Sequence, residues 1–240
     1  MTSVNSPQVL VVDDEVETCK YLRMNLQARG YKTLVATDGT EALQLFNERR
    51  FELILLDITM PGPDGLQVCE HIRRVSDVPI IILSAQGQEA IKVRALNLGA
   101  DDYMTKPFGV REFLARVGAA IRSRGHRGSG SVDDQIEAGD LQIDLATREV
   151  SRAGKPVRLT STEFHLLSLL MRNANKMLTH RYIIQAVWGE SYSDEREYLR
   201  AYMYRLRRKL ERDPSTPSHL LSMPGMGYKF STESTASNTD

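Results

Sequence analysis

Polar side chains stand where several short apolar segments of the chain end. Asp13 and Asp14 follow the first segment, Asp57 ends another, and Ser84 and Lys106 end two later ones. Clustered carboxylates repel one another, and Mg²⁺, a hard cation that prefers oxygen ligands, relieves that repulsion. A carboxylate beside Mg²⁺ can attack phosphorus while a lysine neutralises the phosphoryl oxygens. Any one of these residues alone is explained as a solvated polar residue at the end of a strand. Together they predict a site for phosphoryl transfer.

The elements that must position these residues alternate between two patterns. Residues 8–124 contain β-rich segments such as "QVLVVD", "LILLDI" and "PIIILSA", separated by helical patterns such as "VREFLARVGAAIRSR". This alternation predicts an α/β fold, with a doubly wound parallel sheet and helices on both of its faces. Ligands of such sheets bind beyond the carboxyl ends of the strands, which is where the polar residues are expected.

A change in composition divides the chain. Residues 125–135, "GHRGSGSVDDQ", are rich in glycine, serine and charge, and they predict a flexible linker between a domain of residues 1–124 and a domain of residues 136–231. The second domain shows short strand-like segments, three helical patterns and a final hairpin. Thr160 and Glu163 have capping-box spacing at the start of one of these helices. Residues 232–240 are predicted to form a disordered tail.

Residues 198–210, "YLRAYMYRLRRKL", form a basic helical pattern without an acid. An apolar stripe predicts the buried side of this helix: Leu199, Met203, Leu206 and Leu210. The other sides suit the major groove of double-stranded DNA, which admits one α-helix. The predicted DNA-binding residues are Arg200, Ala201, Tyr204, Arg205, Arg207 and Arg208. On charge alone, a solvated surface explains the pattern equally well.

The segments "VVDDE", "LLDITMPGPDG", "IILSA" and "GADDYMTKPF" resemble the signature segments of the receiver domain of two-component response regulators. The resemblance implies a flavodoxin-like (βα)5 domain that a sensor histidine kinase phosphorylates on Asp57. It implies a catalytic role for Ser84 and Lys106, which would contact the phosphoryl group. A Mg²⁺ site is also implied, with Asp14 and Asp57 as direct ligands, Asp13 acting through water, and the backbone carbonyl of Thr59.

The same resemblance implies a switch. Tyr103 matches an aromatic switch position, so that Ser84 would move toward the phosphate and Tyr103 would rotate into the vacated space. An ordinary half-buried aromatic residue is the alternative. The bond between Lys106 and Pro107 is implied to be cis.

Phosphorylation is further expected to produce a homodimer. The family positions that pair across its two-fold axis are occupied by Lys92, Asp102, Glu112 and Arg116. The expected pairs are Lys92 with Glu112 and Asp102 with Arg116. Exposed pairs of this kind contribute only ~0–1 kcal/mol each, so several of them must act together.

The second domain resembles the winged-helix effector of the OmpR/PhoB family over about residues 136–230, through "LTSTEFHLLSLLM", "MLTHRYIIQAVWG", the basic helix and "GMGYKF". Its C-terminal part looks like KdpE-type regulators of a potassium pump operon. The resemblance implies a recognition helix over about residues 194–211, a wing tip at "PGMGYK", and a loop over 188–192 that faces RNA polymerase. Pro224 stands where many relatives have an arginine that reads the minor groove. Because this chain lacks that arginine, the only DNA contact expected from the wing is one between Lys229 and a phosphate.

Bulk properties narrow the function only slightly. The chain has 31 basic and 31 acidic residues, so net charge identifies no partner. It shows no membrane-spanning segment and no signal-peptide pattern, and both cysteines fall in helical patterns, which favours a cytoplasmic protein with reduced thiols. A phosphatase or phosphotransferase with an aspartyl nucleophile is disfavoured. Such an enzyme needs a second acid, as general acid and base, two residues after the nucleophile, and two residues after Asp57 this chain has Thr59.

We therefore predict a DNA-binding transcription regulator that is not an enzyme, beyond the receiver's own phosphorylation and dephosphorylation. The alternative is an interaction adaptor that contains a receiver and lacks sequence-specific DNA binding.

Overall fold

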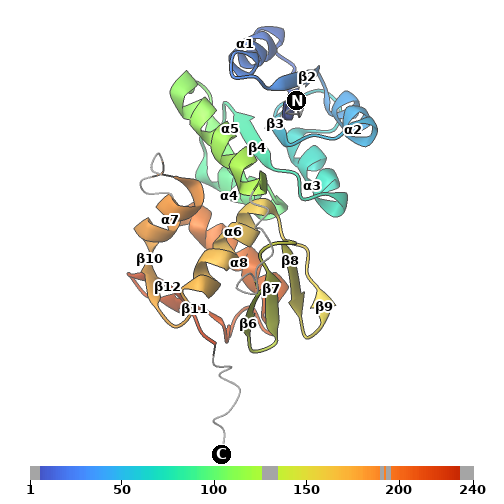
Figure 1. Ribbon diagram of the computed structural model, residues 1–240. Coiled ribbons are helices and arrows are strands. Elements are labelled where there is room, and N and C mark those ends of the chain that lie inside the picture. Colours follow the sequence, from blue (N-terminus) through green and yellow to red (C-terminus); the bar gives the residue numbers. More distant parts are fainter. Residues whose placement is uncertain (1–5, 126–134, 190–191, 193–195, 233–240) are drawn as a thin grey trace, which may run out of the picture. The chain divides into compact units, whose positions relative to one another are not determined.

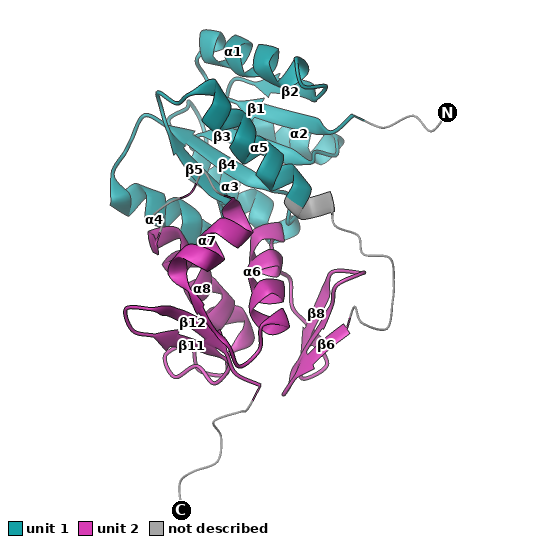
Figure 2. Cartoon of the chain, turned by 60° about the vertical axis from the view of Figure 1, so that its left-hand side comes forward, with its two compact units in different colours: residues 1–124 teal, residues 125–240 magenta. Residues whose placement is uncertain are grey.

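The computed structural model describes residues 6–125, 135–189, 192 and 196–232 (Figure 1). The chain divides into two compact units, residues 1–124 and residues 125–240, which Figure 2 distinguishes by colour. Unit 1 has one sheet and unit 2 has two, and each unit has its own helices and buried apolar side chains.

Unit 1 is built on a five-stranded parallel sheet with the order β2-β1-β3-β4-β5. Its strands are β1 (Gln8–Val12), β2 (Lys32–Ala36), β3 (Leu53–Asp57), β4 (Ile80–Ser84) and β5 (Asp102–Thr105). The strand order reverses between β1 and β3, which is the place where doubly wound sheets bind ligands. The predicted α/β fold is confirmed.

Helices bury both faces of this sheet, because successive side chains of a strand point to opposite faces. Val9, Val11 and Leu55 belong to a core cluster that α1 and α5 complete, while α2, α3 and α4 cover the other face (Figure 1). The helices are α1 (Val16–Gln27), α2 (Gly39–Glu48), α3 (Gly65–Val75), α4 (Glu89–Leu98) and α5 (Val110–Gly125). The apolar segment that ends at Asp57 is therefore buried along its whole length.

The loop after β3 brings the start of α3 close to Asp57. A Cβ atom on Gly65 would lie 1.9 Å from the Asp57 carbonyl oxygen, so glycine is required there. Asp64 caps α3 in a capping box with Gln67. These contacts fix the backbone beyond the carboxylate.

Unit 2 combines two antiparallel sheets with three helices in its described part. The four-stranded sheet has the order β6-β7-β8-β9 and the three-stranded sheet the order β10-β12-β11. The strands are β6 (Gln135–Ala138), β7 (Leu141–Asp144), β8 (Glu149–Arg152), β9 (Lys155–Pro156), β10 (Met177–Thr179), β11 (Leu220–Met223) and β12 (Gly227–Phe230). The helices are α6 (Ser161–Arg172), α7 (His180–Trp188) and α8 (Arg196–Leu210). The hairpin β11–β12 is the wing of a winged-helix domain, as predicted.

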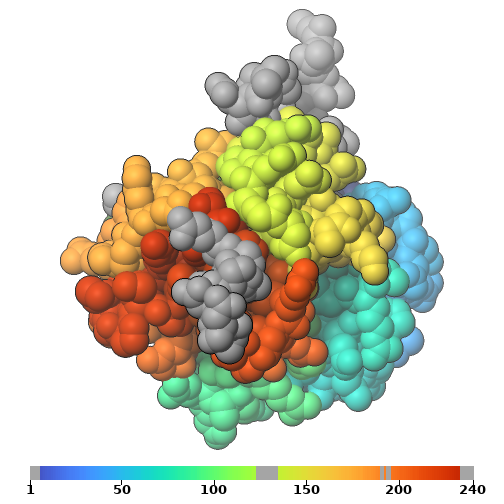
Figure 3. All heavy atoms as spheres, turned by 90° about the horizontal axis from the view of Figure 1, so that it is seen from below, coloured from blue at the N-terminus to red at the C-terminus, as the bar shows by residue number. Residues whose placement is uncertain are grey.

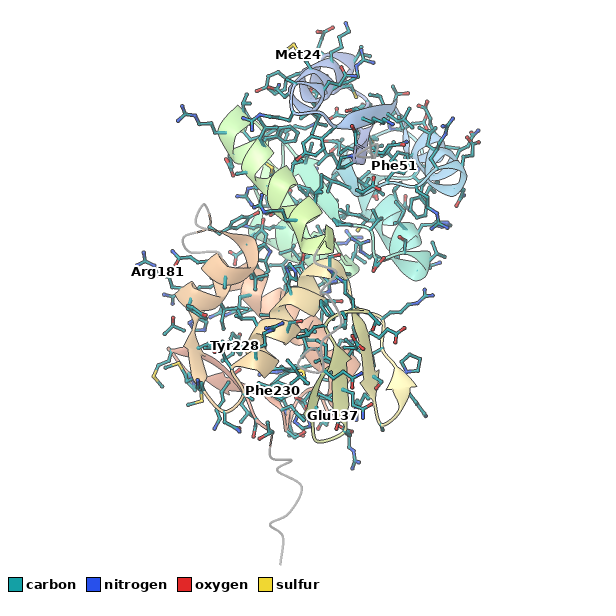
Figure 4. The ribbon with its side chains drawn as sticks, in the orientation of Figure 1. Met24, Phe51, Glu137, Arg181, Tyr228 and Phe230 are labelled. Atoms are coloured by element: carbon teal, nitrogen blue, oxygen red, sulfur yellow. The ribbon has the colours of Figure 1, made fainter. Side chains whose placement is uncertain are left out.

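Aromatic contacts anchor the last strand of the wing. Figure 4 labels Tyr228 and Phe230, both on β12. Phe230 is fully buried and stacks on His219 with ring centroids 5.6 Å apart. Tyr228 meets His180, the first residue of α7, edge to face at 5.6 Å. The wing is thereby tied to the helical part of the unit.

The ends of several helices and strands agree in part with the sequence expectations. Thr160 and Glu163 form the predicted capping box at the start of α6. Because α5 ends at Gly125 and β6 begins at Gln135, the two end residues of the expected linker belong to secondary structure, and residues 126–134 lie outside the described part. The expected tail also lies outside it, apart from Thr232.

Both cysteines are buried free thiols. Among the described residues, no helix is both long enough and apolar enough to span a bilayer.

Candidate functional site

The carboxyl ends of β1, β3 and β5 converge on one ammonium group. Lys106 Nζ lies 2.6 Å from Asp13 Oδ2 and 2.7 Å from Asp57 Oδ1. Asp13 is fully buried, and Asp57 is 5% exposed. The sheet thus gathers three of the predicted residues at the point where its strand order reverses.

Burial and neighbouring charges set the acid–base properties of this pocket. Burial raises the pKa of Asp57, the hydrogen bond and charge of Lys106 oppose that rise, and the Asp13 charge adds to it. For Lys106, burial lowers the pKa but the bonds to Asp13 and Asp57 outweigh it, so the pKa is raised. The Thr59 N–H donates to Asp57 Oδ2 at 2.6 Å. A poorly hydrated carboxylate, held through both oxygens beside a fixed cation, is suited to attack phosphorus.

The predicted metal ligands do not form a closed cage. Asp14 is exposed, whereas Asp13 and Asp57 are buried against Lys106. The described residues contain no group of three or more His, Cys, Asp or Glu side chains arranged to hold a metal ion. The donor set nevertheless fits Mg²⁺, because three carboxylates lie at two neighbouring strand ends and one lysine balances a single charge.

Ser84 and Tyr103 meet at the loop that follows β4. Both are buried, and the Tyr103 hydroxyl donates to the Gln86 carbonyl oxygen. The Gln86 N–H donates to Ser84 Oγ at 3.1 Å, and the Gln86 side-chain amide donates to Thr59 Oγ1 at 3.4 Å. Gln86 therefore links the loops after β3 and β4. The sequence reasoning missed it, and its position two residues after a polar strand end was the available signal.

Helix α8 presents a narrow exposed edge instead of a broad basic face. The predicted apolar stripe is buried, as expected. The exposed side chains recur every four residues and so form one line along the helix: Arg196, Arg200, Tyr204 and Arg208. We call this line the exposed edge of α8. The Arg208 guanidinium lies 5.8 Å from the Tyr204 ring centroid, and Arg200 pairs with Glu197 at 2.6 Å.

Arg205 does not lie on this edge, and its predicted placement facing DNA is wrong. Its side chain is 8% exposed, and Nη2 lies 2.7 Å from Oε1 of the fully buried Glu163. Lys209 Nζ lies 2.6 Å from the other Glu163 oxygen. Burial alone would raise the pKa of Glu163, but the charges of Arg205 and Lys209 outweigh burial and lower it. Arg205 therefore joins α8 to the start of α6.

The sequence reasoning missed Glu163 as a partner of α8. The signal was the four-residue spacing of Arg205 and Lys209, which places two cations on one side of the helix. The buried surface of α8 is wider than the predicted apolar stripe and also includes Tyr198 and Tyr202. For this reason the side with Arg205 is buried.

Of two further predicted DNA contacts, the one at Ala201 is corrected and the one at Arg207 stays a prediction. Ala201 is 5% exposed and lies within the buried arc of α8. Arg207 turns toward β11, where Nε and Nη2 donate to the Leu220 carbonyl oxygen at 2.9 and 2.6 Å. Arg207 therefore holds the wing against α8.

The loop predicted to face RNA polymerase, residues 188–192, lies partly outside the described residues. Its first and last residues, Trp188 and Tyr192, are buried. Both rings pack against Tyr198 of α8, at centroid distances of 6.5 and 6.3 Å.

Two family models match the chain. The response regulator receiver domain matches residues 9–118, and the C-terminal domain of transcriptional regulatory proteins matches residues 154–230. Among similar proteins, the transcriptional regulatory protein KdpE of Mycobacterium tuberculosis is 43% identical over 222 residues, which are 92% of this chain and 98% of that protein. The chain belongs to the OmpR/PhoB family of response regulators.

Other similar proteins agree with this family. The KDP operon transcriptional regulatory protein KdpE of Escherichia coli and the sensory transduction protein RegX3 of Mycobacterium tuberculosis are each 40% identical, over 92% of this chain and 98% of those proteins. The solved structure of a mutant of RitR has a TM-score of 0.75 at 25% identity and covers 94% of this chain and 99% of that chain. The response regulator DrrB of Thermotoga maritima has a TM-score of 0.50 at 28% identity with the same coverage. As predicted, the protein is a DNA-binding transcription regulator of a two-component system.

In this response regulator, residues expected to pair between protomers are paired within the chain. Arg116 Nη1 lies 2.8 Å from Asp102 Oδ1, and Arg116 Nη2 lies 2.8 Å from Glu112 Oε1. Asp102 and Arg116 are buried. Within the chain these two residues join β5 to α5, and the expected pairing of Asp102 with Arg116 of a second protomer stays a prediction. The pairing of Lys92 with Glu112 stays a prediction.

The peptide bond between Lys106 and Pro107 is cis, as the family resemblance implied.

Proposed function

We propose that this response regulator accepts a phosphoryl group on Asp57 from a sensor histidine kinase and then binds double-stranded DNA through α8. The observation that carries the proposal is the Lys106 ammonium between the buried carboxylates of Asp13 and Asp57. An Asp57 oxygen forms a bond to phosphorus as the bond from phosphorus to the donor nitrogen of the kinase breaks. Lys106 offsets charge on the phosphoryl oxygens, and the Ser84 hydroxyl donates a hydrogen bond to one of them.

Receiver domains in general depend on Mg²⁺ for phosphorylation. When bound, Mg²⁺ supplies further neutralisation of the phosphoryl oxygens. We assign its direct ligands to the carboxylates of Asp14 and Asp57 and the backbone carbonyl of Thr59, with Asp13 acting through water. The excess of acid over Lys106 in this pocket supports the assignment.

The contacts of Tyr103 support its role as a switch. Its hydroxyl donates to the Gln86 carbonyl and interacts with Ser84. When the Ser84 hydroxyl turns to the phosphoryl group, Tyr103 loses one of these partners, and its ring moves into the vacated space.

The output of the switch is transcription control. We place the regulated promoter in an operon of the Kdp, potassium-pump type, because two similar proteins carry the name KdpE and one is named for the KDP operon. A phosphorylation-dependent homodimer, contact of the 188–192 loop with RNA polymerase, and a cytoplasmic location complete this proposal.

Phosphorylation with a small donor tests the site. The protein is incubated with acetyl phosphate and Mg²⁺, and its intact mass is measured. Wild type and the control Asp64→Asn, which alters the cap of α3 outside the pocket, should gain one phosphoryl group, whereas Asp57→Asn should gain none. Equal uptake by Asp57→Asn and wild type would refute the assignment.

A further inference from the structure

We propose that the wing tip of this response regulator is an apolar wedge, in which Met226 enters the minor groove between two base pairs and kinks the duplex. This inference rests on the proposed binding of DNA through α8. It adds a second way of recognising a DNA sequence. A protein that kinks the duplex between two base pairs prefers sequences that deform easily at that point.

The turn at the wing tip is closely defined by its sequence. Pro224 and Gly225 occupy its two central positions, Gly225 has φ +74°, and the Met226 N–H donates to the Met223 carbonyl at 3.0 Å. These are the features of a type II turn, which favours proline first and requires a positive φ second. Pro224, which stands where many relatives have arginine, therefore shapes the turn.

The backbone of the tip is anchored on its other side as well. The His180 N–H at the start of α7 donates to the Met226 carbonyl oxygen at 3.1 Å. At Gly227, a Cβ atom would lie 1.8 Å from the Leu178 carbonyl oxygen, so β12 approaches β10 too closely for any side chain. Met226 is thus held through both its N–H and its carbonyl group.

The side chain of Met226, in contrast, faces open space. It is 50% exposed. A Cβ atom built on the neighbouring Gly225 meets nothing within 4 Å. An exposed methionine on a fixed turn loses little backbone freedom on binding, and methionine is one of the side chains that proteins insert between base steps.

The wing is held against α8. The Arg200 charge acts on both Tyr228 and His180, the residues that flank the tip. Arg207 joins the other wing strand to α8 through Leu220 and Ser222. Figure 3 shows the red spheres of the wing segment at the surface beside the orange spheres of the segment before it. With α8 in the major groove, this hairpin reaches the adjoining minor groove.

A bending measurement tests the wedge. Wild-type protein, with Mg²⁺ and beryllium fluoride, selects a duplex from a random-sequence library, and that duplex carries a fluorophore at each end. Bound wild type should shorten the end-to-end distance measured by energy transfer. Met226→Ala should restore the straight duplex and weaken binding roughly 4- to 12-fold, which corresponds to burial of about half a methionine side chain.

Matched variants separate an apolar wedge from a general effect of the wing. Met226→Leu should retain the bend and Met226→Gln should lose it, because the wedge must be apolar. Met177→Ala removes another exposed methionine, 40% exposed on β10 of the same sheet, and should bend and bind DNA as wild type does. A bend that persists in Met226→Ala or Met226→Gln, or wild-type binding without a bend, overturns the wedge and leaves the DNA-binding proposal intact. If no duplex is selected, both proposals fall.

Discussion

Replacing Glu163 with glutamine should strongly destabilise unit 2 without changing the shape of its interior. Glu163 is fully buried and lies 2.7 Å from Arg205 and 2.6 Å from Lys209. Glutamine is isosteric and can still accept the N–H of Thr160, which donates to the Glu163 carboxylate at 2.8 Å. The capping box is therefore retained, and the substitution removes only the negative charge.

The magnitude follows from burial. Removing one partner of a buried ion pair costs about 3–5 kcal/mol, because it leaves an uncompensated charge. Arg205 is 8% exposed and bears the full effect, whereas Lys209 is 34% exposed and water screens part of its charge. We therefore expect the free energy of unfolding to fall by about 3–4 kcal/mol. For a domain of this size, a loss of 3 kcal/mol lowers Tm by at least about 12 °C.

The chain offers a probe that reports on unit 2 alone. Trp188 is the single tryptophan in the sequence, and its ring packs 5.2 Å from that of Tyr202. Urea titrations of the full chain at pH 7, followed by tryptophan emission, therefore measure the unfolding of this unit. The control is Glu197→Gln, which breaks the exposed pair with Arg200 and should change stability by only ~0–1 kcal/mol.

The pH dependence gives an independent check. The folded-state pKa of Glu163 is lowered below its ordinary value of 4.5, so its stabilisation is complete above that value and is lost as pH falls through the folded pKa. The stability gap between wild type and Glu163→Gln should thus be constant from about pH 6 to 8 and narrow only below about pH 4.5. A gap under about 1 kcal/mol at pH 7, or one equal to that of Glu197→Gln, would refute the assignment of a buried charge network.

Three further predictions concern other charged contacts. Arg208→Ala should weaken duplex binding and reduce the slope of log affinity against log salt by about 0.9, and an unchanged slope would exclude a phosphate contact. Arg73 of α3 forms a buried ion pair with Asp101 at 2.6 Å, so Asp101→Ala should lower the stability of unit 1 by about 3–5 kcal/mol. Glu70→Ala, which breaks an exposed pair with Arg74, should cost under about 1 kcal/mol, and circular dichroism in urea measures both changes. In sedimentation with beryllium fluoride, Lys92→Glu should weaken the dimer and added Glu112→Lys should restore it, and absence of rescue would contradict the pair.

The sequence alone determined the grouping of Asp13, Asp57 and Lys106 at one edge of the sheet. Parallel strands carry their carboxyl ends to one edge of a sheet, so a polar residue at the end of each apolar segment must lie near the others whatever the helices do. Asp13, Asp57 and Lys106 meet as expected for this reason. The apolar stripe of α8 was also predictable, because a helix side with four aliphatic residues cannot stay in water.

Only the tertiary structure decided which charges face the solvent. Helical periodicity gives the angle of Arg205 around α8, but it says nothing about α6, whose buried Glu163 comes from 42 residues earlier in the chain and binds that guanidinium. Likewise, Asp102 and Arg116 have the charges of a dimer contact, yet β5 and α5 pack so that the two neutralise each other. A long charged side chain takes the partner that packing brings within reach, and that partner is fixed by contacts between elements far apart in the sequence.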